Sequence, residues 1–309
     1  MLGKKILCCF FALGVSISAF ATEHDSSDYE NRLSEFAQDI NQSLGDRVVA
    51  VVELGGYGGV NSLVAIGRAT RAPEKELRIA AIQAVVGWKG DGKWDVVSPL
   101  LNDTDRDVRG YAGYSLMPLW SELNEGQRKH VDKAATIYLE DVFKNTDKYQ
   151  YFVQKGVVSF YKGDIALAER AFVDAIKLDG ERERAYIMLS EVYSSLSDKE
   201  KVISILKKGI VTLPNSASLH FTAGLAYVRV GDEVLSEKYL KKAAMLEPDS
   251  ERYLSTYAAR ISKTKPIEAS EYLFKTAEIT GREEYKSAAC GVLLNISKEK
   301  ANKCISENL

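Results

Sequence analysis

Small and large apolar residues recur at intervals of 34 residues along the second half of the chain. The aligned segments begin at Tyr149, Glu183, Ala217 and Glu251. Position eight of each segment is small and position twenty-four is large and apolar: Gly156, Ser190, Gly224, Ala258 and Phe172, Leu206, Leu240, Phe274. A small residue lets two helices approach closely, and we expect the large residue to fill the space between successive hairpins. A fixed period in which small and large residues keep the same positions predicts four stacked helical hairpins over residues 149–282.

The third segment carries the fullest version of this pattern, in Gly224, Tyr227, Gly231, Ala243 and Pro248. The pattern resembles the tetratricopeptide repeat (TPR). The segments depart from the family in four places: Ser159 replaces a usual aromatic residue, and Val202, Ser236 and Ser270 replace a usual alanine. The resemblance implies an all-α fold, a right-handed α-solenoid of helical hairpins.

A second period, of 31 residues, precedes the first. Arg47, Arg78 and Arg109 stand 31 residues apart, and alanine follows each of them after three residues. The stretch 100–109 resembles the end of one HEAT-type hairpin and the start of the next, with Asp105 or Asp107 capping the coming helix. We expect the arginines at the rim and the alanines at helix contacts, in a HEAT-like array.

The glycine run 55–59 interrupts the first of these units. A phosphate-binding loop would follow a β-strand and end in Gly-Lys-Ser or Gly-Lys-Thr, whereas Val60-Asn61-Ser62 follows here. The run therefore favours a flexible turn between helices.

Helical spacing of apolar residues predicts two further helices. One spans residues 28–44 and caps the first hairpin, and a longer one spans residues 124–145 and bridges the two arrays. The predicted organisation is a signal peptide (1–21), a capping helix with HEAT-like repeats (22–123), a bridging helix (124–148), four TPRs (149–282) and a C-terminal capping hairpin (283–309).

The first residues have the pattern of a secretory signal. Lys4 and Lys5 precede an apolar run from residue 6 to 17, and Ala19-Phe20-Ala21 offers a cleavage site after Ala21. An uncleaved anchor is the alternative, although a bilayer span takes about 20 apolar residues. We expect an exported, periplasmic protein whose mature form does not bind a membrane.

Cleavage would leave 39 basic against 43 acidic residues, a net charge of −4. This mild acidity argues against a nucleic-acid-binding surface, which needs clustered Lys and Arg.

Cys290 and Cys304 remain after cleavage and flank a turn at Ser297. On the two legs of a helical hairpin they would face each other, and an exported protein meets an oxidising compartment. A structural disulfide is the first interpretation. Two free buried thiols, or a redox or metal-binding role, are the alternatives.

No arrangement of residues indicates catalysis. The three histidines, His24, His130 and His220, are not spaced as metal ligands, and no serine lies in a Gly-x-Ser-x-Gly setting. We therefore expect no catalytic residue, no metal and no cofactor, and a hydrolase is disfavoured because it needs a converging set of such groups.

The order of the two arrays adds a wider resemblance. From Asp46 to Arg282 the chain is similar to the C-terminal module of certain exported bacterial multihaem cytochromes. The Cys-x-x-Cys-His motif of covalent haem attachment is missing. The resemblance thus implies a module that acts with a separate partner, such as a multihaem cytochrome.

The TPR resemblance also implies where a partner would bind. In that family, positions two, five, nine, twelve and thirteen of each first helix line a concave groove. Here they are Gln150, Val153, Val157, Phe160, Tyr161; Arg184, Ile187, Glu191, Ser194, Ser195; Ser218, Phe221, Leu225, Val228, Arg229; and Arg252, Ser255, Ala259, Ser262, Lys263. Aromatic and arginine side chains are frequent anchors of interfaces, so we single out Phe160, Tyr161, Arg184, Ile187, Phe221, Leu225, Arg229 and Arg252. The alternative is that the apolar members only pack against neighbouring helices.

The function predicted is that of a non-catalytic scaffold or adaptor in the bacterial periplasm, which binds a protein or extended peptide in this groove. The alternative is an accessory subunit of an exported multihaem redox enzyme.

Overall fold

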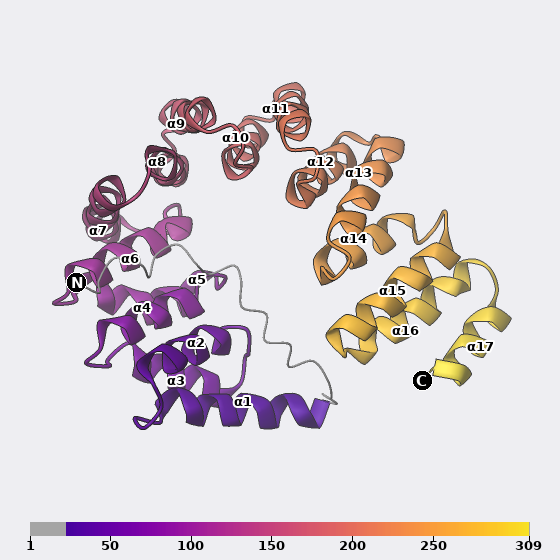
Figure 1. Cartoon of the computed structure of the whole chain (residues 1–309), viewed down its shortest axis with the longest axis horizontal. Coiled ribbons are helices and arrows are strands. Elements are labelled where there is room, and N and C mark those ends of the chain that lie inside the picture. Colours follow the sequence, from indigo (N-terminus) through magenta and orange to yellow (C-terminus); the bar gives the residue numbers. More distant parts are fainter. Residues whose placement is uncertain (1–22, 309) are drawn as a thin grey trace.

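The computed structural model describes residues 23–308, and over this range the chain forms only helices, turns and connecting loops. The expected signal peptide and its cleavage after Ala21 lie outside the described residues. Successive antiparallel helices pair into hairpins that stack along one curved axis (Figure 1). The prediction of an all-α solenoid is confirmed.

The N-terminal half contains seven α-helices and two short 3-10 helices. They are α1 Glu23–Gln38, α2 Leu44–Leu54, α3 Val60–Ala69, α4 Lys75–Ala84, α5 Gly90–Val97, η1 Ser98–Asn102, α6 Arg106–Leu116, η2 Met117–Leu119 and α7 Glu125–Asn145.

The C-terminal half continues with five hairpins. Their helices are α8 Lys148–Lys162, α9 Ile165–Leu178, α10 Arg184–Ser195, α11 Lys199–Thr212, α12 Ala217–Val230, α13 Glu233–Leu246, α14 Glu251–Ile261, α15 Pro266–Thr280, α16 Glu283–Val292, η3 Leu293–Asn295 and α17 Lys298–Asn308.

The 31-residue period sets the spacing of the first hairpins. Helices α2, α4 and α6 begin at residues 44, 75 and 106, and α4 packs against both α2 and α6. Ala50, Ala81 and Ala112 are buried at these contacts. As the sequence indicates, Asp105 caps α6, because its carboxylate accepts hydrogen bonds from the backbone N–H groups of Asp107 and Val108.

Two arginines of this period, Arg78 and Arg109, hold the turn that precedes their helix. The guanidinium of Arg78 donates to the backbone oxygens of Ala72 and Pro73, and Arg109 donates to those of Asp103 and Thr104. Arg78 also pairs with the carboxylate of Asp103 at 2.8 Å. The arginine thus satisfies carbonyl groups that the turn leaves without backbone partners.

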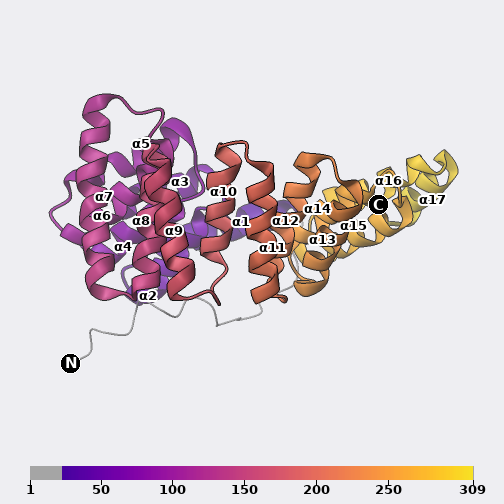
Figure 2. The same ribbon diagram turned by 90° about the horizontal axis from the view of Figure 1, so that it is seen from above.

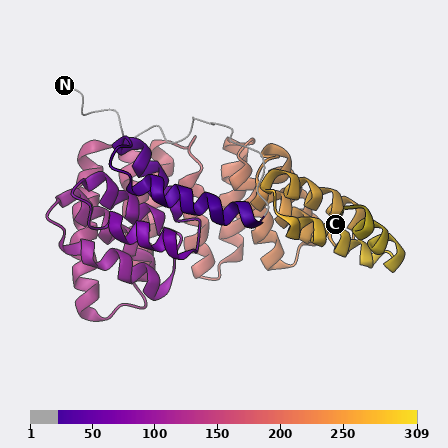
Figure 3. The ribbon, with the colours of Figure 1, turned by 90° about the horizontal axis from the view of Figure 1, so that it is seen from below.

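Helix α1 ends earlier than expected. The spacing of apolar residues predicted one helix over residues 28–44, but α1 stops at Gln38 and Leu44 begins α2. The carboxylate of Asp39 accepts a hydrogen bond from the backbone N–H of Asn41, which stabilises a turn instead of another helical residue. Ile40 is consequently 82% exposed. The helix still packs across α2 and α3, and it projects over the open side of the arc (Figure 3).

The turn at residues 55–59 is closely packed at two of its glycines, whereas Gly58 has open space around it. A Cβ atom on Gly55 would lie 1.9 Å from the backbone oxygen of Ala84, and one on Gly59 would meet the carboxylate of Glu30 at 2.1 Å. Only glycine fits at residue 55, where the neighbour is backbone, whereas the flexible side chain of Glu30 can move away from a Cβ atom at residue 59.

Helix α7 is the second helix of a hairpin with α6 as well as the link to α8. Its most extensive contacts are with α6, and they depend on two glycines. Gly110 lies against Tyr138, and a Cβ atom on Gly113 would lie 2.4 Å from the backbone nitrogen of Ala135. The two backbones therefore approach as closely as glycine allows.

This contact gives a stability prediction. Gly113→Ala should destabilise the protein by about 2 kcal/mol, because the added methyl group meets backbone atoms and forces α6 and α7 apart. Gly67→Ala, in α3, is the matched control: no atom lies within 4 Å of its added Cβ, so the higher helix propensity of alanine should make it neutral or stabilising. Chemical denaturation of both variants measures the difference, and equal stabilities would contradict the close α6–α7 packing.

In the C-terminal half, the small and large positions of the 34-residue period meet inside each hairpin. A Cβ atom on Gly156 would lie 2.6 Å from the ring of Phe172, and one on Gly224 would lie 2.7 Å from the side chain of Leu240. We expected the large residue to fill the space between hairpins, but Phe172 and Leu240 pack against the small residue of their own hairpin. The next hairpin is contacted instead at position twenty-seven, where Gly209 faces Leu219.

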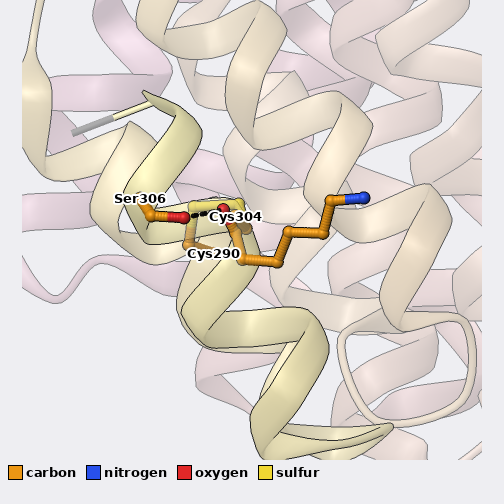
Figure 4. Close-up of a disulfide and its surroundings, with 4 residues drawn as sticks. Cys290, Cys304 and Ser306 are labelled. Carbon is orange, nitrogen blue, oxygen red and sulfur yellow. Dashed lines mark hydrogen bonds between the residues drawn. A yellow bond between two sulfur atoms is a disulfide. The ribbon is translucent and has the colours of Figure 1, made fainter.

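The last hairpin continues the same spacing, since α16 begins at residue 283, close to 34 residues after α14. A disulfide joins Cys290 on α16 to Cys304 on α17, with 5.4 Å between their Cα atoms (Figure 4). Both cysteines are buried. The bond fastens the terminal helix, which packs mainly against α16 and η3.

Candidate partner-binding groove

The first helix of each C-terminal hairpin lies on the inner side of the arc. Figure 1 shows α8, α10 and α12 facing the open centre, with α9, α11 and α13 behind them, and Figure 2 shows the hairpins side by side across the array. Local signals fix these inner helices. Asp147 and Ser216 cap α8 and α12, and Gly163 and Gly231, with φ of 83° and 79°, end them in the left-handed conformation. We refer to the inner face of α8, α10, α12 and α14 as the groove.

Phe221 belongs to a layered contact between α12 and α14. Its ring lies 4.8 Å from that of Tyr253, and the guanidinium of Arg252 covers it at 4.5 Å from the ring centre. Phe221 is only 4% exposed, whereas Arg252 is exposed. A partner would therefore meet the guanidinium and not the ring beneath it.

Arg184 lies where the two halves of the protein meet. Its guanidinium interacts with the hydroxyl groups of Tyr114 and Tyr138, whose rings stack at 4.3 Å. Burial raises the pKa of Tyr114 to about 12, and the positive charge of Arg184 opposes this shift. Tyr161 packs into the same junction, between the N-terminal core and the core of α8 to α11.

The remaining predicted residues divide between packing and exposure. Phe160 and Ile187 pack against the core of α8 to α11, and Leu225 packs against the core of α12 to α16, each of them half-buried. Arg229 is exposed, and within the described residues its side chain has no hydrogen-bonding or charged partner. Val228 beside it is 49% exposed. The apolar residues are thus largely structural, and the arginines are the accessible groups.

A shallow depression of about 350 Å³ opens at one edge of the groove, beside the start of α10. It is lined by Tyr149, Gln150, Glu181, Arg182, Glu183, Arg184 and Leu213. Arg182 covers the ring of Tyr149 at 3.9 Å and pairs with Asp147 at 2.8 Å, so its charge is already matched. Arg184 is the cation there that is left for a ligand.

The sequence interpretation missed three aromatic residues that shape the groove. Tyr114 and Tyr138 interact electrostatically with Arg184, and Tyr253 packs against Phe221, whose ring Arg252 covers. Tyr253 occupies position three of its repeat, which the family pattern does not count as lining. The close spacing of Tyr111 and Tyr114 on one helix was the available signal for the first cluster.

Residues 23–308 contain neither a metal site nor a membrane-spanning helix. No group of three or more His, Cys, Asp or Glu side chains is placed to hold a metal ion there. His220 is buried, its Nε2 is 2.9 Å from the backbone oxygen of Pro214, and burial lowers its pKa. None of the described helices combines the length and the apolar character needed to cross a membrane.

Comparisons with known proteins agree on helical repeats but reach only low similarity. No family model matches the chain, and no curated protein matches it. Among solved structures, a TPR protein from Thermus thermophilus is 22% identical, with 59% of this chain and 99% of that chain covered and a TM-score of 0.42. The C-terminal part of a TPR repeat-containing protein from Cytophaga hutchinsonii is 17% identical, with 70% and 88% covered and a TM-score of 0.47.

A third solved structure, YrrB, is described as a TPR protein with an unusual peptide-binding site. It is 15% identical, with 55% of this chain and 90% of that chain covered and a TM-score of 0.43. At these values the similarities assign neither a family nor a function to the chain. The fold rests on the helix pairing itself, which makes the chain an all-helical repeat protein.

Proposed function

We propose that this protein is a non-catalytic scaffold that binds another protein, or an extended segment of one, along the groove. The observation that carries the proposal is the accessible inner face of α10, α12 and α14. There Arg184, Arg229 and Arg252 are exposed, whereas Phe221 is buried and Ile187 and Leu225 are half-buried. Arginine at a concave surface is a frequent anchor of protein interfaces.

We propose further that the first half is HEAT-like, that the second half consists of TPRs, and that the protein works in the periplasm. The disulfide between Cys290 and Cys304 supports an oxidising compartment, and the residue pattern of the N-terminus supports export. A mature protein that begins at Thr22 and has no reactive thiol would agree with this location. No contact among the described residues favours the alternative of an accessory subunit of a multihaem enzyme.

The binding proposal is tested by substitution at the exposed end of α12. Arg229→Ala should weaken capture of the co-purifying partner about tenfold, since an arginine anchor contributes more than about 1 kcal/mol. Quantitative mass spectrometry of affinity-purified, cross-linked complexes measures the amount of the partner.

Lys208→Ala is the matched control, because Lys208 is an exposed cation on the outer helix α11. Capture that falls equally in both variants, or in neither, would contradict binding in the groove. Phe221→Ala is unsuitable for this purpose, since Phe221 is buried and its loss would disturb the fold.

A further inference from the structure

The charges of the groove differ from those of the whole chain. The chain carries a net charge of −2. The twenty groove-lining positions carry four cations, Arg184, Arg229, Arg252 and Lys263, and one acid, Glu191, so their net charge is +3. A positive inner face on a slightly negative protein is a charge asymmetry of the kind that selects and steers a ligand.

These four cations also lack the acid partners that some cations on the outer helices have. On α9 and α11, Lys177 pairs with Asp174 at 3.5 Å and Lys201 pairs with Asp198 at 3.3 Å. Among the residues that the structure describes, Arg184, Arg229, Arg252 and Lys263 form no ion pair. The positive charge of these four inner side chains is therefore not neutralised by an ion pair, a feature that they share with Lys207 and Lys208 on the outer helix α11.

Their placement fits an extended chain. Arg184 and Arg252 occupy position two of their repeats, at the start of α10 and α14. Arg229 and Lys263 occupy position thirteen, near the end of α12 and in the turn that follows α14. The two positions are eleven residues apart, which is about 16 Å where the chain is helical, at 1.5 Å per residue. An extended peptide covers this width with about five residues. Two rows of cations thus border a strip that an extended segment can cross.

Hydroxyl groups and small apolar residues lie beside these cations and between the two rows. Ser195 and Ser262 donate to backbone oxygens of their own helices at 2.7 and 2.9 Å. A hydroxyl group can rotate and donate instead to a carboxylate. Val228 and Ala259 are exposed beside them and can contact the stem of a peptide side chain.

From these observations we infer that the partner contributes an extended segment rich in Asp and Glu, whose carboxylates pair with Arg184, Arg229, Arg252 and Lys263. The inference rests on the proposed function and adds the chemistry of the ligand to it. Guanidinium groups bind carboxylates through paired N–H donors. The three arginines can therefore each form a bidentate contact with a carboxylate, which Lys263 cannot.

The test measures binding of fluorescent twelve-residue peptides to the mature full-length protein by anisotropy. One peptide contains six Glu and Asp residues, the second replaces them with Gln and Asn, and the third replaces them with Lys. We expect binding of the acidic peptide only, with at least a tenfold loss of affinity between 50 and 300 mM NaCl because the charges are exposed. Equal binding of the neutral peptide would overturn the inference.

Charge reversal at the groove is the second arm. Arg229→Glu combined with Lys263→Glu should weaken the acidic peptide at least tenfold, whereas Lys207→Glu combined with Lys208→Glu, on the outer helix α11, should leave its affinity unchanged. Circular dichroism confirms that both variants fold. Equal losses in the two variants, or equally tight binding of a single-stranded oligonucleotide or of vesicles containing phosphatidylglycerol, would overturn selective recognition of an acidic peptide. If Arg229→Ala lowers partner capture while the three peptides bind alike, only the charge inference fails and the proposed function stands.

Discussion

Arg78→Ala should destabilise the protein by about 3–5 kcal/mol, which is the loss expected when one partner of a buried ion pair is removed. The side chains of Arg78 and Asp103 are only 11% and 8% exposed, and two nitrogens of the guanidinium contact the carboxylate. The substitution leaves the carboxylate buried without its cation. It also removes the donor to the backbone oxygens of Ala72 and Pro73. Urea denaturation followed by circular dichroism measures the change.

Two controls separate this effect from the loss of any surface arginine. Arg71→Ala should change the stability by less than about 0.5 kcal/mol, because Arg71 is exposed and its side chain has no partner among the described residues. Asp103→Asn in the Arg78→Ala background should recover part of the loss, since it removes the unpaired charge. If Arg78→Ala costs no more than Arg71→Ala, the arginine does not hold the turn between the first two hairpins.

The second large effect is expected at the end of the array, where Cys304→Ser should destabilise α17 by about 3 kcal/mol. The bond closes a short loop, with a sequence separation of 14 residues, and the chain-entropy model gives about this value for such a loop. Because α17 packs mainly against α16 and η3, the loss should stay local, as in other repeat proteins where each unit contacts only its neighbours.

Hydrogen exchange distinguishes this local loss from global unfolding. Amides of α17 should lose protection in Cys304→Ser, and in the wild type after reduction, while amides of α12 keep theirs. Ser306→Ala is the control in the same helix, because Ser306 bonds only to the backbone oxygen of Lys303 (Figure 4). Unchanged exchange in α17 after reduction would contradict the role of the disulfide.

The helical repeats of the second half could be predicted because their signal is local and recurrent. Gly156 with Phe172, and Gly224 with Leu240, meet inside single hairpins, so sequence spacing alone relates them. The same reasoning failed at residues 39–44, where apolar spacing continues through Asp39 although its carboxylate stabilises a turn. Sequence reasoning also missed the pairing of α6 with α7. That pairing depends on the close approach of Gly113 to Ala135, which lie on different helices and share no repeat spacing.

The groove could be predicted only in part, because exposure at its surface depends on the distance between neighbouring hairpins. Phe221 stands at a lining position by sequence, but Tyr253 and Arg252 of the next repeat cover its ring. Arg184 is similarly tied to Tyr114 and Tyr138, which come from the other half of the chain. No spacing within one repeat reveals contacts of this kind.

The position of the partner on the arc is tested most directly by a photo-cross-linking amino acid placed at one of two valines. Val228 lies on the inner helix α12 and is 49% exposed, and Val211 lies on the outer helix α11 and is 83% exposed. Binding in the groove predicts that the probe at residue 228 cross-links one identified partner through an acidic segment, and that the more exposed probe at residue 211 does not. The same partner cross-linked from residue 211, with none from residue 228, would contradict it.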